Sequence, residues 1–257
     1  MIDCLISFGS NLGNSRQIIL DAVESLESGH PVFNLRISEF LITPPVGGPP
    51  GQPDFINGAA RFDTNLTPLE LLGLLHQTET DFGRERRIRW DSRTLDLDLL
   101  LYGNRILAEN DCEIPHPRMS FRQFVLVPAQ SIAAEMTHPV SRCSIGSLLE
   151  RIQVETRVLL LTERSRLDEI AKRLSDFPGN FQMETGCLDQ WKDLVSETSP
   201  ARLLILDLTC QDPQEFLAQH PELVPRHRGP LLVLHEQPVQ QVVLEISAAM
   251  EAMKAIR

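Results

Sequence analysis

The sequence lacks several features that would assign its class directly. No apolar run approaches the about 18 residues that a transmembrane helix needs, so no membrane segment is expected. Lysine is absent from residues 1–150, which hold twelve arginines and 19 acidic residues, and the whole chain carries a net charge of -11. Aromatic residues make up only 5%. This balance argues against a general nucleic-acid binder, which would need a basic surface.

Paired cysteines and targeting signals are also missing. The five cysteines are odd in number and widely scattered, without a C-x-x-C motif, which favours reduced thiols and gives no zinc-site spacing. The N-terminal stretch is apolar at once, with Asp3 inside it and no basic segment before it, so no secretory signal is expected. Together these features predict a cytoplasmic protein.

A concentrated group of charges stands out against this background. Residues 84–93 contain five arginines and lead into the apolar segment 95–101. Asp96 and Asp98 are two apart there, so in an extended chain they project from one face. Neighbouring carboxylates repel each other, and a divalent cation with oxygen ligands removes the conflict, while arginines suit a polyphosphate. The pattern predicts phosphoryl-type transfer. The alternative, a solvent-facing acidic pair beside a solvated loop, is disfavoured because the segment has the composition of a buried strand.

Hydrophobic periodicity predicts an α+β first domain. Thr67-Pro68 is a favourable helix start, and the segment 43–51, rich in proline and glycine, must be a loop. The order β-α-β-β-α-β is that of a ferredoxin-like core, an antiparallel sheet with two helices on one face. The predicted strands are 2–8, 33–41, 55–63 and 95–101, and the predicted helices are 15–26 and 67–79.

The pattern changes from residue 157. Short continuous apolar runs alternate with amphipathic segments, as in parallel α/β sheets. We therefore expect a first domain over 1–155 and a smaller α/β domain over 156–257. Asp207 stands at the end of a predicted strand and Thr209 follows it, which is compatible with a receiver-like or a degenerate nucleotide-binding domain. Because no glycine-rich phosphate motif is present, we prefer a non-catalytic module that mediates self-association or binds a protein partner. The short apolar runs that predict its strands are residues 158–161, 203–206 and 231–234.

Eight motifs follow one another within residues 1–150: Phe8-Gly9-Ser10-Asn11-Leu12-Gly13, Thr43-Pro44-Pro45-Val46-Gly47, Gln52-Pro53-Asp54-Phe55-Ile56-Asn57, Gly83-Arg84-x-Arg86, Arg89-Trp90, Arg93-Thr94-Leu95-Asp96-Leu97-Asp98, Pro115-His116-Pro117-Arg118-Met119 and Arg122-x-Phe124-Val125-Leu126. In this combination they resemble the 6-hydroxymethyl-7,8-dihydropterin pyrophosphokinase family of the folate pathway. The resemblance implies transfer of the terminal pyrophosphoryl group of ATP to the pterin hydroxymethyl group, with release of AMP. It also implies a ferredoxin-like core.

The resemblance implies the residues that handle ATP. Asp96 and Asp98 match ligands of two Mg²⁺ ions that bridge the ATP phosphates, and Arg84 and Arg93 match phosphate-clamping arginines. Arg86 and Trp90 match residues on a mobile loop of the family that closes over ATP. The residues implied to contact the nucleotide are Glu79, Arg86, Trp90, His116 and Arg122.

The resemblance also implies a pterin site. Phe55 and Phe124 match an aromatic pair that sandwiches the flat ring, and Asn57 matches a side chain that contacts its amide edge. Without the motifs, both phenylalanines would be interpreted as core residues. The loop residues implied to offer backbone groups to the pterin are Thr43, Pro44 and Val46.

Two departures and two rival hypotheses remain to be weighed. Asp91-Ser92 stands where the family often has Gly-Pro, and His76 stands where it sometimes has glutamine. Neither change removes a metal ligand or a clamping arginine, so we expect an active enzyme.

The alternative is a catalytically impaired scaffold for the C-terminal domain. An RNA-recognition module shares the β-α-β-β-α-β order but needs exposed strand aromatics and a basic sheet face. The low aromatic content and the net charge of -11 disfavour that module. The expected partners are therefore ATP and the pterin, with no nucleic acid and no membrane.

Overall fold

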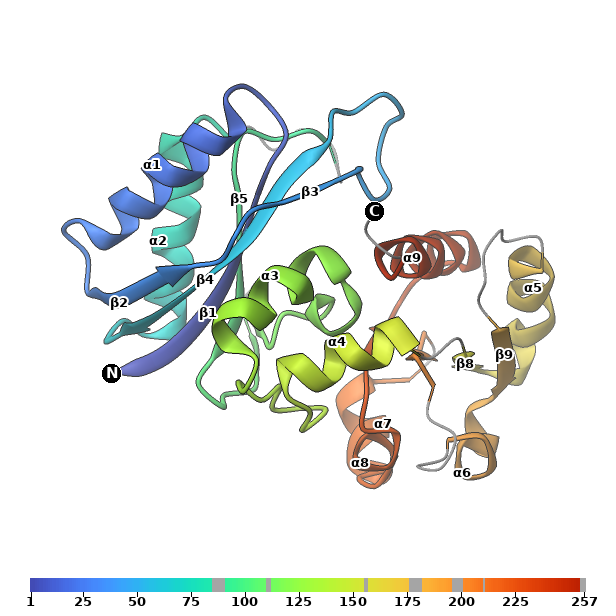
Figure 1. Ribbon diagram of the computed structural model, residues 1–257. Helices are drawn as coiled ribbons and strands as arrows, with labels where there is room; N and C mark the ends of the chain where they lie inside the picture. The colour runs from blue at the N-terminus through green and yellow to red at the C-terminus, as the bar shows by residue number, and fades with distance from the viewer. Residues whose placement is uncertain are drawn as a thin grey trace. The chain divides into compact units, whose positions relative to one another are not determined.

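The chain forms two compact units in the computed structural model, which describes residues 1–84, 91–109, 112–154, 157–175, 182–195, 201–209 and 211–254 (Figure 1). Unit 1 comprises residues 1–119 and 124–139, and unit 2 takes Ser120–Gln123 and the chain from Val140 on. The predicted domain boundary at residue 155 stays a prediction. By its contacts, the segment 140–154 belongs with unit 2.

Unit 1 is built on a five-stranded antiparallel sheet of order β2-β4-β1-β5, with β3 also paired to β4. This arrangement confirms the predicted α+β class and the β-α-β-β-α-β order. Its elements are β1 (Ile2–Ser10), α1 (Ser15–Glu27), β2 (Val32–Ile37), β3 (Leu41–Thr43), β4 (Phe55–Thr64), α2 (Pro68–Asp81), β5 (Asp96–Tyr102), β6 (Leu107–Glu109), β7 (Cys112–Ile114) and, except for its first residue, α3 (Gln123–Ala133). A 3-10 turn (Met119–Phe121) begins in unit 1 and ends in the segment Ser120–Gln123 of unit 2.

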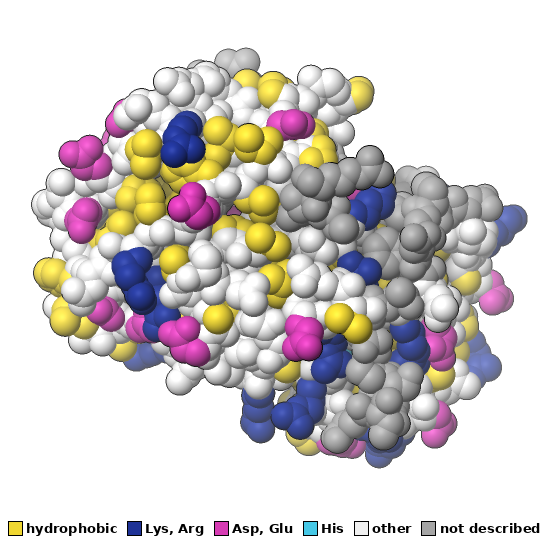
Figure 2. Space-filling view, in the orientation of Figure 1, with side chains coloured by type: hydrophobic (Ala, Val, Ile, Leu, Met, Phe, Trp, Pro, Cys, Tyr) yellow, Lys and Arg dark blue, Asp and Glu magenta, His cyan; other side chains and the backbone are white. Residues whose placement is uncertain are grey.

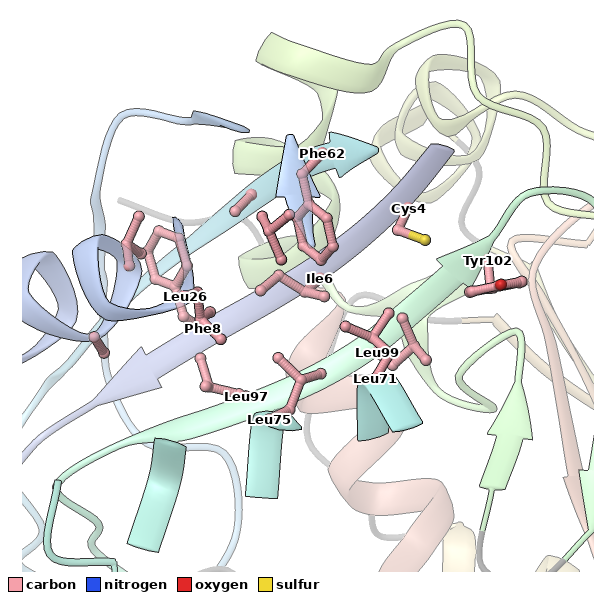
Figure 3. Packing of buried hydrophobic residues seen from close by; sticks show 14 of the residues in the cluster. Cys4, Ile6, Phe8, Leu26, Phe62, Leu71, Leu75, Leu97, Leu99 and Tyr102 are labelled. Carbon is pink, nitrogen blue, oxygen red and sulfur yellow. The ribbon is translucent and has the colours of Figure 1, made fainter. Parts of the chain in front are cut away.

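The helices α1 and α2 cover one face of the sheet. Side chains alternate along a strand, so Ile6 and Phe8 of β1 point to the same face, where they meet Leu26 of α1 and Leu75 of α2 (Figure 3). Each such buried side chain contributes about 1.5–3 kcal/mol. This packing fixes the end of β1 against the start of β5, where the charged motifs lie.

The start of α2 is fixed by a capping box. The Thr67 hydroxyl accepts from the Glu70 backbone N–H at 3.4 Å, and the Glu70 carboxylate accepts from the Thr67 N–H at 2.8 Å. Pro68 occupies the first helical turn, where no hydrogen-bond donor is needed. The cap predicted from Thr67-Pro68 is therefore confirmed, and it sets the axis of the helix that carries Glu79.

The prediction of one strand over 33–41 is wrong in one respect, because residues 38–40 separate two strands, β2 and β3. β2 is also irregular within its own length. The pairing of β2 with β4 shifts register between Phe33 and Arg36, and Asn34 adopts a positive φ of 55°. Asparagine tolerates this left-handed conformation better than most residues. The alternation breaks there, so Phe33 is exposed while Leu35 packs against the core.

Unit 2 is a parallel α/β unit. Its four strands have the order β11-β10-β8-β9, and every pair is parallel, which confirms the predicted class. The polar edge strand β9 was not predicted because it contains no apolar run. The elements are α4 (Ile145–Val154), β8 (Arg157–Thr162), α5 (Arg164–Leu174), β9 (Gln182–Cys187), a 3-10 turn (Leu188–Gln190), α6 (Trp191–Leu194), β10 (Leu203–Asp207), α7 (Pro213–Gln219), α8 (Leu223–His227), β11 (Leu231–Leu234) and α9 (Val239–Ala252).

Asp207 lies at the carboxyl end of β10, beside β8. In open α/β sheets ligands bind where the strand order reverses, and these two strands flank that point. The Asp207 side chain is completely buried and accepts from Thr162 Oγ1 at 2.8 Å, Arg166 Nε at 2.9 Å and Thr209 Oγ1 at 2.6 Å. Its oxygens are therefore occupied by side chains of unit 2 itself.

The visible surface of unit 1 carries many acidic side chains (Figure 2), in line with the excess of acidic residues over arginines in residues 1–150. On the face seen in the space-filling view, Asp and Glu side chains are dispersed over unit 1 among apolar patches (Figure 2). Among the described helices, none combines the length and apolar character that crossing a membrane would require.

Candidate active site

The two aspartates lie on β5 with the alternation expected from their spacing. Asp96 and Asp98 are partly exposed, whereas Leu97 and Leu99 are buried against α1 and α2. The carboxylates therefore project from the sheet face opposite to these helices. Because β5 pairs with β1, Asp96 lies opposite Gly9 at the end of β1.

Both predicted clamping arginines converge on Asp96. Arg84 Nη1 lies 2.6 Å from Asp96 Oδ1, and Arg93 Nη1 donates to Asp96 Oδ2 at 2.7 Å. The three side chains are only 16–21% exposed. In such a partly desolvated cluster, charge-assisted hydrogen bonds are stronger than on an open surface. The cluster therefore concentrates two cationic groups beside the acidic pair.

Glu79 anchors Arg84 from behind. Its side chain, on α2, is 2% exposed, and Oε1 accepts from the backbone N–H of Leu97 at 2.7 Å. The same oxygen pairs with Arg84 Nη1. A buried carboxylate needs such partners. Glu79 thus ties α2, β5 and Arg84 together, while its predicted contact with the nucleotide stays a prediction.

His116 faces the second aspartate. Its Nε2 lies 3.8 Å from Asp98 Oδ2, and its Nδ1 accepts from the backbone N–H of Arg118 at 3.1 Å. The backbone N–H of His116 donates to Leu100 O at 3.0 Å, which ties this segment to β5. Because Nδ1 accepts, the neutral ring carries its proton on Nε2, the atom that faces Asp98.

The residues predicted to contact the pterin begin on β3 and β4. Asn57 is buried and its Nδ2 donates to Thr43 Oγ1 at 3.0 Å. A Cβ on Gly9 would lie 3.2 Å from Asn57 Oδ1, so glycine permits the close approach of β1. Phe55 is half-buried, and the Arg93 guanidinium lies 5.9 Å from its ring centroid. The pterin contacts of Thr43, Phe55 and Asn57 stay predictions, as do those of Pro44, Val46 and Phe124.

Gly58, next to Asn57 on β4, lies close against the Phe8 ring of β1. A Cβ there would lie 2.2 Å from Cε2 of Phe8, so only glycine fits. Phe8 in turn fills the space between β1 and the helices. This contact brings β4 and β1 together just beyond Asn57.

Three predicted nucleotide residues cannot be placed at this cluster. Arg86 and Trp90 lie outside the described residues. Arg122 belongs to the segment Ser120–Gln123 of unit 2. Their roles stay predictions.

A polar network beside Arg93 was not predicted from the sequence. Asn11 Oδ1 accepts from the Arg93 N–H at 2.8 Å, and Nδ2 donates to Pro53 O at 3.1 Å and to Ser92 Oγ at 3.3 Å. Ser92 Oγ donates to Gln52 Oε1 at 3.2 Å. These partners lie 40 to 82 residues apart, which no local pattern can reveal. Asn11, Gln52, Pro53 and Arg93 lie in the motifs quoted above, which was the available signal, whereas Ser92 does not.

The donor set of β5 suits Mg²⁺. This ion keeps several waters and binds through one or two carboxylates plus substrate phosphates, and Asp96 and Asp98 offer such a pair on one face. Within the described parts of the chain, no group of three or more His, Cys, Asp or Glu side chains is arranged to hold a metal ion. The two carboxylates fit an ion shared with a polyphosphate.

Comparisons with known proteins give one family. The family model described as 7,8-dihydro-6-hydroxymethylpterin-pyrophosphokinase (HPPK) matches residues 5–134. The 2-amino-4-hydroxy-6-hydroxymethyldihydropteridine pyrophosphokinase of Haemophilus influenzae is 41% identical over 142 residues, 55% of this chain and 88% of that protein. The protein of the same name from Synechocystis sp. is 48% identical over 148 residues, 58% of this chain and 75% of that protein. A crystal structure of Plasmodium falciparum HPPK-DHPS aligns with a TM-score of 0.44 and 11% identity, over 96% of this chain and 82% of that one.

Proposed function

The chain belongs to the 7,8-dihydro-6-hydroxymethylpterin-pyrophosphokinase family, and we propose that its reaction takes place at the charged cluster on β5. It is a pyrophosphokinase that transfers pyrophosphate from ATP to the hydroxymethyl group of 6-hydroxymethyl-7,8-dihydropterin in folate synthesis, releasing AMP. The observation that supports the assignment of the site is the convergence of Arg84 and Arg93 on Asp96, with Asp98 on the same strand face.

Asp96 and Asp98 would hold two Mg²⁺ ions. The ions would neutralise phosphate charge at the attacking and leaving oxygens of the in-line displacement. Arg84 and Arg93 would exchange part of their contact with Asp96 for phosphate oxygens, which guanidinium groups bind through two parallel hydrogen bonds. His116, with its proton on Nε2 beside Asp98, would donate to a phosphate oxygen. Glu79 would keep Arg84 in place.

The pterin would lie against Phe55 and Phe124, with Asn57 at its polar edge. Asn57 already donates to Thr43 Oγ1, so its carbonyl oxygen is the atom left to accept from the ring amide. Buried polar side chains of this kind give specificity because a ligand lacking the matching group would leave them unpaired. The loop and nucleotide contacts proposed alongside are Pro44, Val46, Arg86, Trp90 and Arg122.

Three broader proposals accompany the site. The enzyme acts in the cytoplasm, residues 1–155 form the catalytic domain, and residues 156–257 form an interaction module without catalytic groups. The bonding of Asp207 supports the last point, because its carboxylate is fully buried and satisfied within unit 2. No feature of the described site favours a catalytically impaired scaffold.

Release of AMP from ATP, measured with and without the hydroxymethyl pterin, tests the site. We expect pterin-dependent AMP that disappears when a chelator removes Mg²⁺ and returns when Mg²⁺ is restored. Asp96→Asn and Asp98→Asn should each lower kcat by about a hundredfold or more, since loss of one preorganised electrostatic group costs that much in other enzymes. Asp21→Asn, on the exposed face of α1, is the matched control. Near-normal turnover of either site variant at saturating Mg²⁺ would contradict the metal assignment.

A further inference from the structure

The Ser92 hydroxyl joins two side chains that come from distant parts of unit 1. It donates to Gln52 Oε1 at 3.2 Å and accepts from Asn11 Nδ2 at 3.3 Å. A hydroxyl has one donor and two acceptor positions, so both bonds can form at once. Ser92 directly precedes Arg93, which bonds to Asp96. The hydroxyl is thus one residue away from the phosphate clamp.

Gln52 carries this link into the loop between β3 and β4. Its Nε2 donates to Pro49 O at 3.2 Å and to Gly47 O at 3.5 Å. Three glycines of this loop, Gly47, Gly48 and Gly51, have positive φ, so the chain turns in a way that few other residues would permit. The loop runs from Thr43 to Phe55, both proposed pterin contacts. Gln52 therefore bridges the pterin loop, residues 44–53, to Ser92.

Asn11 carries the link in the other direction, to the core. Its Oδ1 accepts from the Arg93 N–H at 2.8 Å, and its own N–H donates to Arg93 O at 3.1 Å. Both polar groups of the Arg93 peptide backbone are therefore bonded to one residue. Asn11 directly follows β1, whose Phe8 is fixed in the core. Its Nδ2 also donates to Pro53 O at 3.1 Å, which adds a second tie to the pterin loop.

We propose that Gln52, Ser92 and Asn11 are positioning residues that couple the pterin loop to the Arg93 clamp. The inference rests on the proposed function, since it takes Arg93 to bind phosphate and the loop to bind the pterin. Neither Gln52 nor Ser92 needs to touch a substrate. Their bonds place the loop and the clamp together, so that loosening one end displaces the other.

Kinetics of the full-length protein test the coupling, with Ser92→Ala, Gln52→Ala and the double variant compared with the wild type. Each single change should raise KM for the pterin and also lower kcat, with an overall loss in kcat/KM of about three- to tenfold, the scale of one neutral hydrogen bond. The double variant should lose no more than the worse single variant, because either change already breaks the link. Ser92→Thr, which keeps the hydroxyl, should restore most of the activity.

The outcomes separate the inference from the proposed function. Ser131→Ala is the matched control, because this exposed serine on α3 donates to the carbonyl of Pro128 in its own helix. If the wild type releases no pterin-dependent AMP, the proposed function fails. If the wild type is active and the losses of the two single variants multiply in the double variant, Gln52 and Ser92 act independently and the coupling is wrong. A rise in KM with unchanged kcat would restrict their role to the loop and would also overturn the inference.

Discussion

Each unit holds an aspartate that is bonded to arginine at one end of a strand, yet the two aspartates differ in their access to solvent. Asp96 in unit 1 is 21% exposed and shared by two arginines that are themselves partly exposed. Asp207 in unit 2 is completely buried, with two hydroxyls and Arg166 on its oxygens. An aspartate–arginine pair can therefore bind a ligand or stabilise the fold. Its role depends on how deeply the carboxylate is buried and on whether all its oxygens already accept hydrogen bonds.

The comparison predicts that Asp207→Asn affects stability and spares catalysis. Removal of one partner from a buried ion pair costs about 3–5 kcal/mol, because the other charge is left without compensation. Arg166 is 14% exposed, so partial hydration places the expected loss at the lower end. Denaturant unfolding followed by Trp fluorescence reports this loss directly, since the buried Trp191 belongs to unit 2.

Activity per folded molecule is the second measurement on the Asp207→Asn variant. It should stay near the wild-type value while the unfolding midpoint falls. Asp212→Asn is a suitable control, because Asp212 is an exposed helix cap in the same unit. A variant that keeps its stability but loses pterin-dependent turnover would remove the distinction drawn between the two aspartates.

Acid should destabilise unit 2 through His227. Burial lowers the pKa of this histidine from 6.5 to about 4, aided by the nearby Arg151 and Arg157. A lowered pKa in the folded state means that protons favour the unfolded chain, so the stability is complete above pH about 6.5 and is lost as the pH falls toward 4. The expected loss is about 3 kcal/mol at most.

His227→Gln separates this contribution from the rest of the chain. The variant should unfold with a weaker pH dependence between pH 4 and 6.5 than the wild type, as measured by urea unfolding at several pH values. The corresponding histidine of unit 1, His138, has a pKa that burial also lowers to about 4, so His138→Gln tests whether unit 1 shows the same acid sensitivity. An unchanged pH dependence in both variants would mean that neither histidine stays neutral in the folded chain.

The open cluster of unit 1 should divide into a phosphate part and a pterin part. Arg93→Ala should lower kcat by roughly ten- to a hundredfold with little change in pterin affinity, because a charge-assisted contact of about 1.5–3 kcal/mol is lost at phosphate. Phe55→Ala should weaken pterin binding and leave ATP binding largely intact. Calorimetry with each substrate distinguishes these profiles, and unchanged turnover with poor pterin affinity in Arg93→Ala would reverse the assignment.

Local patterns in the sequence were sufficient for much of this arrangement. The two-residue spacing of Asp96 and Asp98 placed both carboxylates on one strand face, because side-chain alternation is a property of the extended chain itself. Thr67-Pro68 marked the start of α2 for an equally local reason. The division of the predicted strand into β2 and β3 was missed, and so was the positive φ at Asn34 within β2, since neither leaves a trace in the hydrophobic pattern.

Long-range polar contacts were beyond such patterns. Asn11 bonds to residues 42 and 82 positions away, and its role depends on the sheet having formed first. The polar strand β9 likewise gains its identity from pairing with β8 and not from its own composition. The assignment of α4 to unit 2 is a third case, because its apolar face does not specify which sheet it will cover.

Truncation is expected to have the smallest effect on turnover. Fragments 1–155 and 1–139 both retain the sheet, α1, α2 and the charged cluster, so each should make the pterin pyrophosphate at a rate per folded molecule near that of the full chain. They should differ in solubility. The longer fragment keeps α4, whose buried residues Ile145, Leu148, Leu149 and Ile152 cluster with unit 2, and without that unit this face would be exposed to water. Fragment 1–139 should therefore aggregate less, as measured by light scattering at matched concentration. A fragment that is soluble and folded by circular dichroism but inactive would show that unit 2 contributes to the active site. The contrast between the partly exposed Asp96 and the buried Asp207 would then no longer divide the two units by role.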